Sequence, residues 1–285
     1  MGHSMVSERR WTCRVGSADL DEGRTALNSG RLDRIQQHLY THGSCEIQEL
    51  VAVTGASTAT VRRDLHLLEQ QGLVNRTHGG AMLAASAGPE VAFQMREQEH
   101  LPAKRAIADA AYRLLKPHST IFLDAGTTVL QLARRLRLGT LPVTVFTNGL
   151  AVAQELVNVD GVQINLLGGQ LRNENLSFVG PHAESVLQEL WFDQLFVGTS
   201  AVHRDGSLYT LNIAEARLGR AMLTRTSQAI LLTDSGKFGT HAPYLVAPIT
   251  ACQRLITDHN LDAGWQARLA ELGVASTLVN VERPA

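Results

Sequence analysis

The sequence predicts an α/β protein of two domains, in which a small helical domain precedes a larger domain with a mainly parallel sheet. Its 285 residues suffice for one large or two ordinary domains. In residues 30–83 apolar side chains recur at helical spacing, whereas in residues 101–285 helix-like segments alternate with short apolar strands. Between them, residues 84–100 open with A-A-S-A-G-P-E, which is typical of a linker.

Composition favours an ordinary globular protein, with 44% hydrophobic and 19% charged residues and a formal net charge of −1. That charge gives no overall sign of nucleic-acid binding, so such a function must rest on where individual arginines lie. Residues 1–29 lack sustained periodicity and are predicted to form a mobile tail. No apolar run has the length of a membrane span and no signal peptide opens the chain, which predicts a cytoplasmic protein.

The three cysteines, Cys13, Cys45 and Cys252, are far apart and form no C-x-x-C or Cys/His metal spacing. We therefore expect reduced thiols, no metal site and no cofactor. Cys45 is expected to pack inside the small domain as a hydrophobic side chain.

The small domain opens with two amphipathic helices. Apolar residues repeat at helical spacing first at Leu32, Ile35 and Leu39 and then at Ile47, Leu50 and Val51. The segment T-G-A-S at residues 54–57 follows directly. It predicts the tight, glycine-containing turn of a helix-turn-helix.

The third helix has its apolar face at Val61, Leu65 and Leu68. Ser57 stands at the N-cap position, where its hydroxyl can accept an N–H of the first turn. Gly72 is expected to end the helix because glycine tolerates the left-handed conformation.

The opposite face of this helix carries short hydroxyls followed by paired arginines, and this pattern suits a helix in a DNA major groove. Arginine can bind guanine or clamp phosphate, and serine and threonine reach phosphate or base edges. The alternative is an ordinary amphipathic helix with a solvated face. The flanking turn favours DNA, as does L-V-N-R-T-H-G-G-A at residues 73–81, which predicts a β-hairpin wing that continues to Leu83.

The segments T-V-R-R-D-L at residues 60–65 and L-x-x-x-G-L-x-x-R-x-H-G-G-A at residues 68–81 resemble the DeoR family of bacterial transcriptional regulators, with Val61 where that family usually has Ile. The resemblance implies a winged helix that binds double-stranded operator DNA. Asp64 is expected to hold an arginine in place, because a carboxylate facing phosphate would be repelled. The expected DNA contacts are Ser57, Thr58, Thr60, Arg62, Arg63, Arg76 and His78.

The large domain opens with a predicted helix at residues 103–115. Strands are predicted at residues 120–124, 143–147, 162–167, 194–198, 229–234, 254–258 and 277–281. Helical segments lie between most of them, so the sheet should be mainly parallel with helices on both faces. In such sheets ligands bind beyond the carboxyl ends of the strands.

Five of these strand ends carry small, hydroxylated, amide or charged residues. They are D-A-G-T-T at 124–128, T-N-G at 147–149, L-G-G-Q-L-R at 167–172, G-T-S at 198–200 and D-S-G-K-F-G at 234–239. Each alone is commonly just a turn. Together, at one edge of a sheet, they favour an anion or ligand site.

The same segments, with S-F-V-G at residues 177–180 and G-S-L-Y-T-x-x-x-x-E-A at residues 206–216, resemble the effector domain of the DeoR family. That resemblance implies the fold of ribose-5-phosphate isomerase and glucosamine-6-phosphate deaminase, used to sense phosphorylated sugars. Two departures stand out, Gly236 in place of the second serine of a pair and Val129 in place of a third threonine.

The expected effector-binding residues fall into three kinds. Backbone and side-chain donors are expected from Gly126, Thr127, Thr128, Asn148, Gly168 and Gly169, phosphate charge from Arg172 and Lys237, and acceptors for sugar hydroxyls from Asp124 and Glu215. The resemblance adds Lys104, which matches the lysine that opens this domain in the family. For Lys104 and Arg172 the alternative is a solvated surface charge, and for Asp124 it is turn or cap chemistry.

These observations predict a homo-oligomeric repressor, dimer or tetramer, that a phosphorylated sugar releases from a carbohydrate operon. The rival is a sugar-phosphate isomerase-like enzyme fused to a DNA-binding domain. Ribose-5-phosphate isomerases carry D-G-A-D-E after a central strand, but residues 196–202 here read F-V-G-T-S-A-V, without a carboxylate. A purely architectural DNA-binding protein would leave the strand-end residues without a use. No catalytic residue is therefore predicted.

Overall fold

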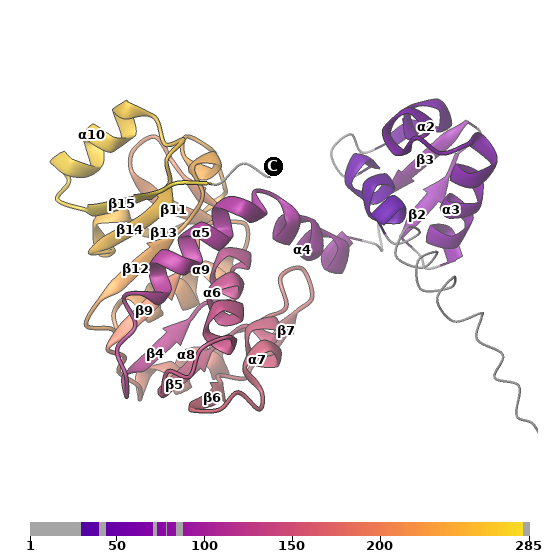
Figure 1. Ribbon diagram of the computed structural model, residues 1–285. Coiled ribbons are helices and arrows are strands. Elements are labelled where there is room, and N and C mark those ends of the chain that lie inside the picture. The colour runs from indigo at the N-terminus through magenta and orange to yellow at the C-terminus, as the bar shows by residue number, and fades with distance from the viewer. Residues whose placement is uncertain (1–29, 40–43, 71–72, 78, 84–87, 282–285) are drawn as a thin grey trace, which may run out of the picture. The chain divides into compact units, whose positions relative to one another are not determined.

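The computed structural model describes residues 30–39, 44–70, 73–77, 79–83 and 88–281. The chain separates into two compact units, Met1–Ala87 and Gly88–Ala285 (Figure 1). The predicted tail, residues 1–29, lies outside the described residues. None of the described helices combines the length and the apolar character that a membrane span requires.

The first unit is a winged helix-turn-helix. Residues 30–39 are helical and are followed by β1 (Ser44–Glu46), α2 (Ile47–Thr54), α3 (Thr58–Gln70), β2 (Val74–Arg76) and β3 (Gly80–Leu83). The hairpin β2–β3 is antiparallel, as predicted, and β3 also pairs with β1. Strand β1 is only three residues long, too short for its alternation to be recognised in the sequence.

One apolar cluster holds this unit together. The predicted helix faces supply it, with Ile35, Leu50 and Leu65 fully buried. Cys45 packs in the same cluster, as predicted. The turn after α2 is closed by Gly55, whose φ of 68° is left-handed and whose N–H donates to the carbonyl of Val51.

The second unit is built on a seven-stranded sheet in which every neighbouring pair is parallel. In spatial order its strands are β15 (Ala275–Val279), β14 (Arg254–Asp258), β12 (Ala229–Leu232), β9 (Gln194–Val197), β4 (Thr120–Leu123), β5 (Val143–Thr147) and β6 (Val162–Leu166). All seven predicted strands are present. The last begins at Ala275, two residues earlier than predicted.

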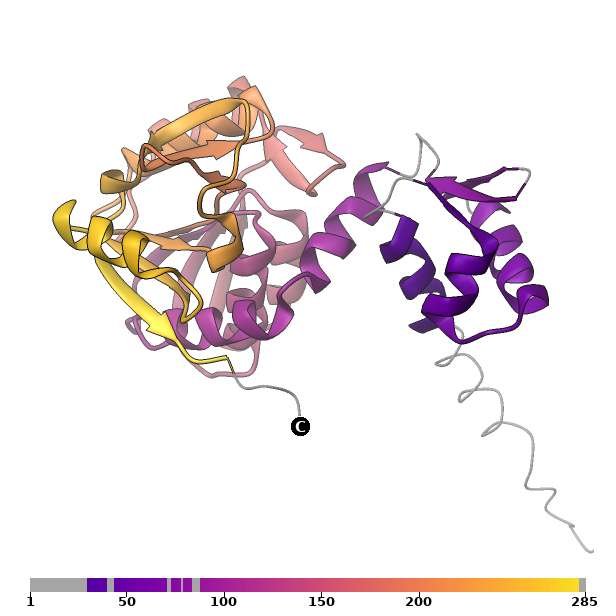
Figure 2. The same cartoon turned by 90° about the horizontal axis from the view of Figure 1, so that it is seen from above.

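Helices cover both faces of this sheet, as predicted (Figures 1 and 2). Ile121 and Leu123 of β4 pack with α5 (Leu101–Tyr112), α6 (Thr127–Arg137) and α7 (Leu150–Leu156). Phe122, between them, packs with α8 (Pro181–Gln188), α9 (Ile213–Leu223) and α10 (Ala263–Glu271) on the other face. Two buried faces explain why the strands are continuous apolar runs.

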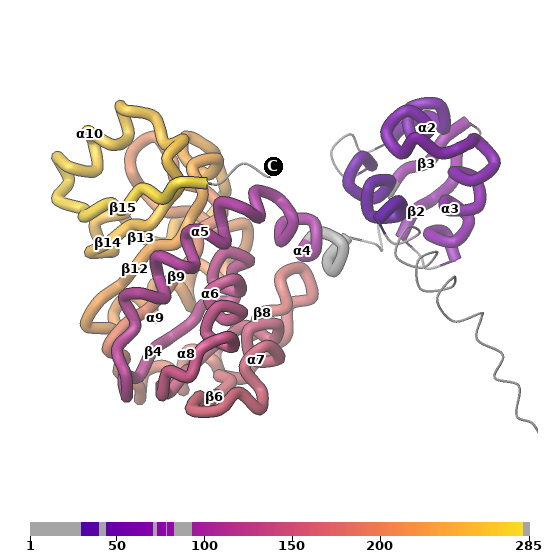
Figure 3. Tube along the Cα trace, in the orientation of Figure 1, coloured from indigo at the N-terminus to yellow at the C-terminus, as the bar shows by residue number. Residues whose placement is uncertain are grey.

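Five strands of the second unit add antiparallel structure that the sequence analysis did not contain. Strand β7 (Gln170–Arg172) pairs with β8 (Ser177–Val179), which runs beside the start of α7 (Figure 3). Strands β10 (Ala201–Val202), β11 (Ser207–Thr210) and β13 (Tyr244–Pro248) form a second small sheet. Two short 3₁₀ turns follow strands, at Ser235–Lys237 and Ile249–Ala251.

Helix α4 (Gly88–Gln98) occupies most of the segment expected to be a linker. Its Phe93 is buried in the cluster formed with α5, α6 and α7. Arg96 donates from Nη2 to the carbonyl of Glu174 at 2.5 Å, which anchors α4 to the β7–β8 hairpin. Residues 84–87 lie outside the described residues.

Candidate DNA-binding surface and effector site

Helix α3 begins as the sequence predicted. The backbone N–H of Thr60 donates to Oγ of Ser57 at 3.3 Å, which is the expected N-cap. The two hydroxyls also lie 2.9 Å apart and share a hydrogen bond. The cap orders the first turn of α3, in which Thr58 lies. The expected stop at Gly72 lies outside the described residues.

Arg62 and Arg63 extend from the exposed face of α3, since Val61 and Leu65 fill the core on the opposite face. Within the described residues neither guanidinium makes a hydrogen bond or an ion pair. Both therefore keep their full donor capacity for phosphate or for guanine.

Asp64 has the structural role that was predicted for it. Its carboxylate accepts from Arg31, with Nε 2.5 Å from Oδ2 and Nη2 3.0 Å from Oδ1. Both side chains are largely buried. This bidentate pair joins the helix of residues 30–39 to α3, so it fixes the orientation of the exposed arginines.

The wing contributes Arg76, which is exposed and lies 3.7 Å from the carboxylate of Glu69 on α3. His78 lies outside the described residues. The glycines of the wing have different roles. A Cβ at Gly80 would lie 1.9 Å from the carbonyl oxygen of Cys45, whereas a Cβ at Gly79 would meet nothing within 4 Å. Gly80 thus permits the close pairing of β3 with β1.

At the carboxyl edge of the large sheet, Asp124 is held by three neighbouring turns. Its carboxylate accepts from the N–H of Ala125 at 2.8 Å and of Gly198 at 3.1 Å, and it is hydrogen-bonded to the Asn148 side chain. Burial nevertheless raises the pKa of Asp124 to about 6, and the charge of Glu215 adds to the rise. Oδ1 of the buried Asn148 has no hydrogen-bond partner among the described residues.

Glu215, near the start of α9, is the second acceptor and already meets three donors. Nη1 of Arg172 lies 2.5 Å from its Oε1, and Oγ1 of Thr210 donates to Oε2 at 2.8 Å. Nδ2 of Asn175 also donates to Oε1. Arg172 lies 3.3 Å from Glu174 as well, so the predicted phosphate ligand is already paired with two carboxylates.

The carbonyl oxygen of Arg96, on α4, links two of the predicted residues. It accepts from Nζ of Lys104 and from Oγ1 of Thr127, the latter at 3.3 Å. Lys104 is buried, and burial lowers its pKa to about 8. Asp234 and Glu99 oppose that decrease, whereas the charge of Lys237 reinforces it.

Lys237 completes the cationic side of this region. Its Nζ lies 3.9 Å from the carboxylate of Glu99, just before α5. The preceding Gly236 is tightly placed, since a Cβ there would lie 3.0 Å from Oδ1 of Asp234 and 3.4 Å from Nε2 of His100. A Cβ there would require these side chains to shift by a few tenths of an ångström.

The predicted glycines and Thr128 have different surroundings. Gly126 precedes α6, and a Cβ at Gly126 would lie 3.7 Å from Cα of Gly198. Thr128 is buried within α6. Gly168 and Gly169 have left-handed φ angles of 73° and 117°, and their nearest side chains are His182 and Ala183 of α8. No hydrogen bond between described residues links these two glycines to Asp124 or Lys104.

The sequence analysis did not single out Arg96 as a ligand neighbour, nor did it name Asn175, Ser177 or Thr210. Asn175 is fixed by the hydroxyl of Ser177, which donates to its Oδ1 at 2.6 Å. Its position inside the polar N-E-N segment before S-F-V-G was the available signal. That signal is weak because such segments are usually solvated loops.

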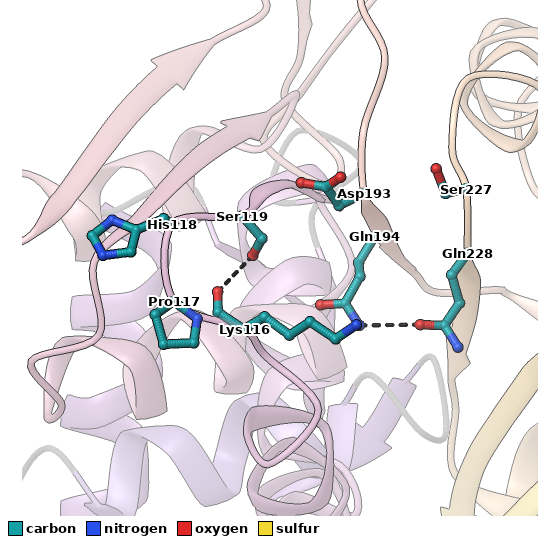
Figure 4. Close-up of a pocket in the computed structure, with 8 residues that line it drawn as sticks. All are labelled: Lys116, Pro117, His118, Ser119, Asp193, Gln194, Ser227 and Gln228. Carbon is teal, nitrogen blue, oxygen red and sulfur yellow. Dashed lines mark hydrogen bonds between the residues drawn. The ribbon is translucent and has the colours of Figure 1, made fainter.

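A separate cavity of about 430 Å³ lies at the opposite, amino edge of the sheet (Figure 4). Its lining includes Lys116, His118, Asp193, Gln194 and Gln228. The amide of Gln194 donates to Oε1 of Gln228 and to the carbonyl of Leu114, both at 3.1 Å. None of the predicted effector residues lines this cavity.

A winged helix-turn-helix with free arginines on its third helix defines the class of this protein as a DNA-binding transcriptional regulator. The family model of the DeoR-like helix-turn-helix domain matches residues 31–87, and that of the DeoR C terminal sensor domain matches residues 99–259. The chain belongs to the DeoR family.

Curated relatives that are transcriptional regulators match this chain over most of its length and most of their own. A putative aga operon transcriptional repressor of Escherichia coli O157:H7 is 36% identical over 90% of this chain and 96% of its own. The HTH-type transcriptional regulator GlpR of Haloferax volcanii is 36% identical over 87% and 96%. The lactose phosphotransferase system repressor of Staphylococcus epidermidis is 33% identical over 81% and 92%.

Solved structures match this chain with low TM-scores and low identity. Ribose 5-phosphate isomerase A of Methanocaldococcus jannaschii is 17% identical with a TM-score of 0.36, over 50% of this chain and 55% of its own. Translation initiation factor eIF-2B of Pyrococcus horikoshii is 14% identical with a TM-score of 0.37, over 81% and 77%. At these TM-scores neither structure bears on the function of this chain.

Proposed function

We propose that this regulator represses a carbohydrate-catabolism operon and that a phosphorylated sugar releases it from operator DNA. The names of two relatives, an aga operon repressor and a lactose phosphotransferase system repressor, support a sugar-linked role. A protein that must reach operator DNA belongs in the cytoplasm. We further propose a homo-oligomer, because two winged helices can bind two half-sites of an operator.

In this proposal the DNA is bound by the N-terminal half of α3 and by the wing. Arg62 and Arg63 supply charge and hydrogen-bond donors, and Arg76 reaches the adjacent backbone. Ser57, Thr58 and Thr60 position the helix start against phosphate, and His78 is retained as a wing contact. The free guanidiniums of α3 support this assignment.

The effector-binding part of the proposal rests on one observation. Asp124, Asn148 and Glu215, all acceptors, share the carboxyl edge of the sheet with the buried ammonium of Lys104. Acceptors suit sugar hydroxyls, and Lys104 with Lys237 suits a phosphate. Arg172 joins the phosphate side only if the ligand displaces Glu215 or Glu174 from it.

Release requires that the sugar phosphate bind the DNA-incompetent state more tightly, since an effector without such a preference shifts no equilibrium. Helix α4 is the proposed transmitter. Its Arg96 carbonyl touches two effector-site side chains, and its guanidinium touches the hairpin that carries Arg172.

We propose no catalytic activity. Asp124, with a pKa of about 6, has a proton affinity suited to a base, which is the observation that favours an isomerase-like alternative. Residues 196–202 nevertheless offer no carboxylate at the place where the isomerases carry theirs. Incubating the protein with ribose 5-phosphate and following the sugar by NMR separates the two, because turnover would support the enzyme.

The deciding experiment is a thermal-shift screen of the full chain against sugar phosphates and their unphosphorylated parents. A ligand that binds only the folded state raises the midpoint as its concentration rises. We expect one phosphorylated sugar to raise it, its parent to leave it unchanged, and the same compound to free bound DNA. If no sugar phosphate shifts the midpoint, the effector assignment fails while the DNA-binding assignment stands.

A further inference from the structure

Three side chains with metal-ligand chemistry converge in the first unit. His38 comes from the helix of residues 30–39, Cys45 from β1 and Glu49 from α2. Their ligand atoms all lie within 4.8 Å of one another, and Nε2 of His38 is 3.8 Å from Oε2 of Glu49. Among the described residues no other group of three or more such side chains meets this condition.

We propose that His38, Cys45 and Glu49 bind a divalent transition-metal ion of the zinc type. Imidazole nitrogen, thiolate sulfur and carboxylate oxygen together form the donor set that zinc takes in proteins. With metal–ligand bonds of about 2.0–2.3 Å, tetrahedral ligands stand roughly 3.3–3.8 Å apart. The distance of 3.8 Å between His38 and Glu49 lies at the upper end of that range, and all three ligand atoms lie within 4.8 Å, so small rotamer adjustments of His38 and Glu49 would complete the geometry.

The backbone around the site is fixed on one side and open on the other. Cys45 is held by the pairing of β1 with β3, where it lies opposite Ala81. The side chain of Glu49 is 58% exposed and that of His38 is 18% exposed, so an ion and a completing water can enter from the Glu49 side. The arrangement is a rigid thiol with two adjustable partners.

Binding displaces one proton, because the thiol must become a thiolate: Cys–SH and Zn²⁺ give Cys–S⁻–Zn²⁺ and H⁺. Burial and the charge of Glu49 raise the pKa of Cys45 to about 11, so the thiol is protonated without metal. A bound cation offsets both effects, because it coordinates the thiolate directly and neutralises the charge of Glu49. The same negative charge that disfavours a bare thiolate favours a cation.

A metal at this site would tie together three elements on which α3 rests. The helix of residues 30–39 already joins α3 through Arg31 and Asp64, and Cys45 lies in the same apolar cluster as Leu65. Zinc would therefore raise the stability of the helix-turn-helix itself. It would act on DNA binding through the folded fraction of this unit and not through the effector site.

The test uses the reduced, chelator-stripped full chain, titrated with Zn²⁺ and, as a spectroscopic probe, Co²⁺. We expect one tightly bound ion per chain, a rise in the unfolding midpoint with zinc, and a thiolate-to-cobalt charge-transfer absorption. Cys45→Ser should lose the absorption, and His38→Gln and Glu49→Gln should weaken binding at least about tenfold. His38 and Glu49 are more exposed than Cys45, so their variants keep the fold if Cys45→Ser does not.

Two matched controls come from the same chain. His66 and Glu69 form a similar pair on α3, 3.7 Å apart, without a thiol among the groups that meet there, and Cys252 is a buried thiol of the second unit. His66→Gln and Cys252→Ser should bind zinc as the wild type does. Zinc binding that survives His38→Gln and Cys45→Ser, or a wild-type chain without the cobalt–thiolate absorption, would overturn the site.

Discussion

Asp124, one of the residues proposed to bind the effector, is a buried carboxylate whose ionisation costs stability. It sits among backbone donors, yet burial raises its pKa from 3.8 to about 6. The folded state therefore binds a proton more tightly than the unfolded chain between about pH 4 and pH 6. At neutral pH the group is ionised, and the folded state carries the cost of that charge.

Asp124→Asn removes this titration, and the sign follows from linkage. In the wild type, the contribution of Asp124 to the free energy of unfolding is largest below pH 4 and is lost as pH rises through 6, by up to about 3 kcal/mol. We expect the stability of the variant relative to the wild type to increase by up to that amount from pH 4 to pH 7. Urea unfolding at both pH values measures it, and a pH-independent difference would contradict the raised pKa.

Arg62 and Arg63 offer a test at the DNA surface. We expect Arg62→Ala or Arg63→Ala to weaken operator binding by about 1–3 kcal/mol per lost base contact, up to complete loss. The reason is that each change removes a guanidinium able to contact a base or a phosphate. DNA selected from a random-sequence pool serves for the gel-shift titration. Arg113→Ala, an exposed arginine of the second unit, is the control. Loss of effector binding in the same variants would indicate misfolding instead.

Lys237 offers a single-residue test of the proposed effector site. Its Nζ is 3.9 Å from Glu99 and is partly exposed, so its removal should leave the fold intact. We expect Lys237→Ala to keep DNA binding and to lose most of the response to the sugar phosphate found in the thermal-shift screen. An unchanged dose–response curve for DNA release would show that Lys237 has no such role.

Among the elements, α4 has the contacts of a transmitter. Phe93, in the middle of the helix, packs in the apolar cluster beside α5, α6 and α7. The Arg96 carbonyl accepts from Lys104 and Thr127, and the Arg96 guanidinium donates to the carbonyl of Glu174. A ligand that draws Lys104 toward its phosphate must take a donor from the Arg96 carbonyl. The helix is therefore sensitive to occupancy at the very residues proposed to bind the effector.

The β1–β3 pair gives a matched test in the DNA-binding unit. We expect Gly80→Ala to destabilise this unit by more than about 1 kcal/mol, because its Cβ would overlap the Cys45 carbonyl oxygen, 1.9 Å away. Gly79→Ala, whose Cβ would meet nothing within 4 Å, should change stability little. The unfolding midpoint measures both, and equal effects of the two changes would contradict the close approach.

At the scale of the whole molecule, the two units have separate apolar clusters. That of the first unit contains no residue of the second, and the two clusters of the second unit flank its sheet. Separate cores support independent folding, with regulation imposed through the chain between them.

We expect a fragment of residues 88–285 to fold and to bind the sugar phosphate without binding DNA. Its α4 keeps Phe93 and Arg96, so the effector site retains its contacts. Circular dichroism and the thermal-shift assay test this, with the full chain as control. A fragment that folds but no longer binds the ligand would show that the first unit contributes to the effector site.

The sequence by itself determined the elements and their apolar faces. Val61, Leu65 and Leu68 specify the buried side of α3, and seven apolar runs specify the strands of the parallel sheet, because periodicity and burial are local properties of the chain. The positions of the strand ends also followed, since parallel strands end at one edge. Strands β7, β8 and β10 did not, because two or three residues are too few for a pattern. Strands β11 and β13 were also missed, although they match the main-sheet strands in length.

Only the tertiary structure decided which charged and polar groups meet. Arg31 pairs with Asp64 from 33 residues away, and Arg172 with Glu215 from another element. Neither pairing is signalled by a periodic pattern in the sequence, because an ion pair depends on the distance between two side chains in space and not on their spacing in sequence. The same reason hid the meeting of His38, Cys45 and Glu49, whose spacing matches no familiar metal motif.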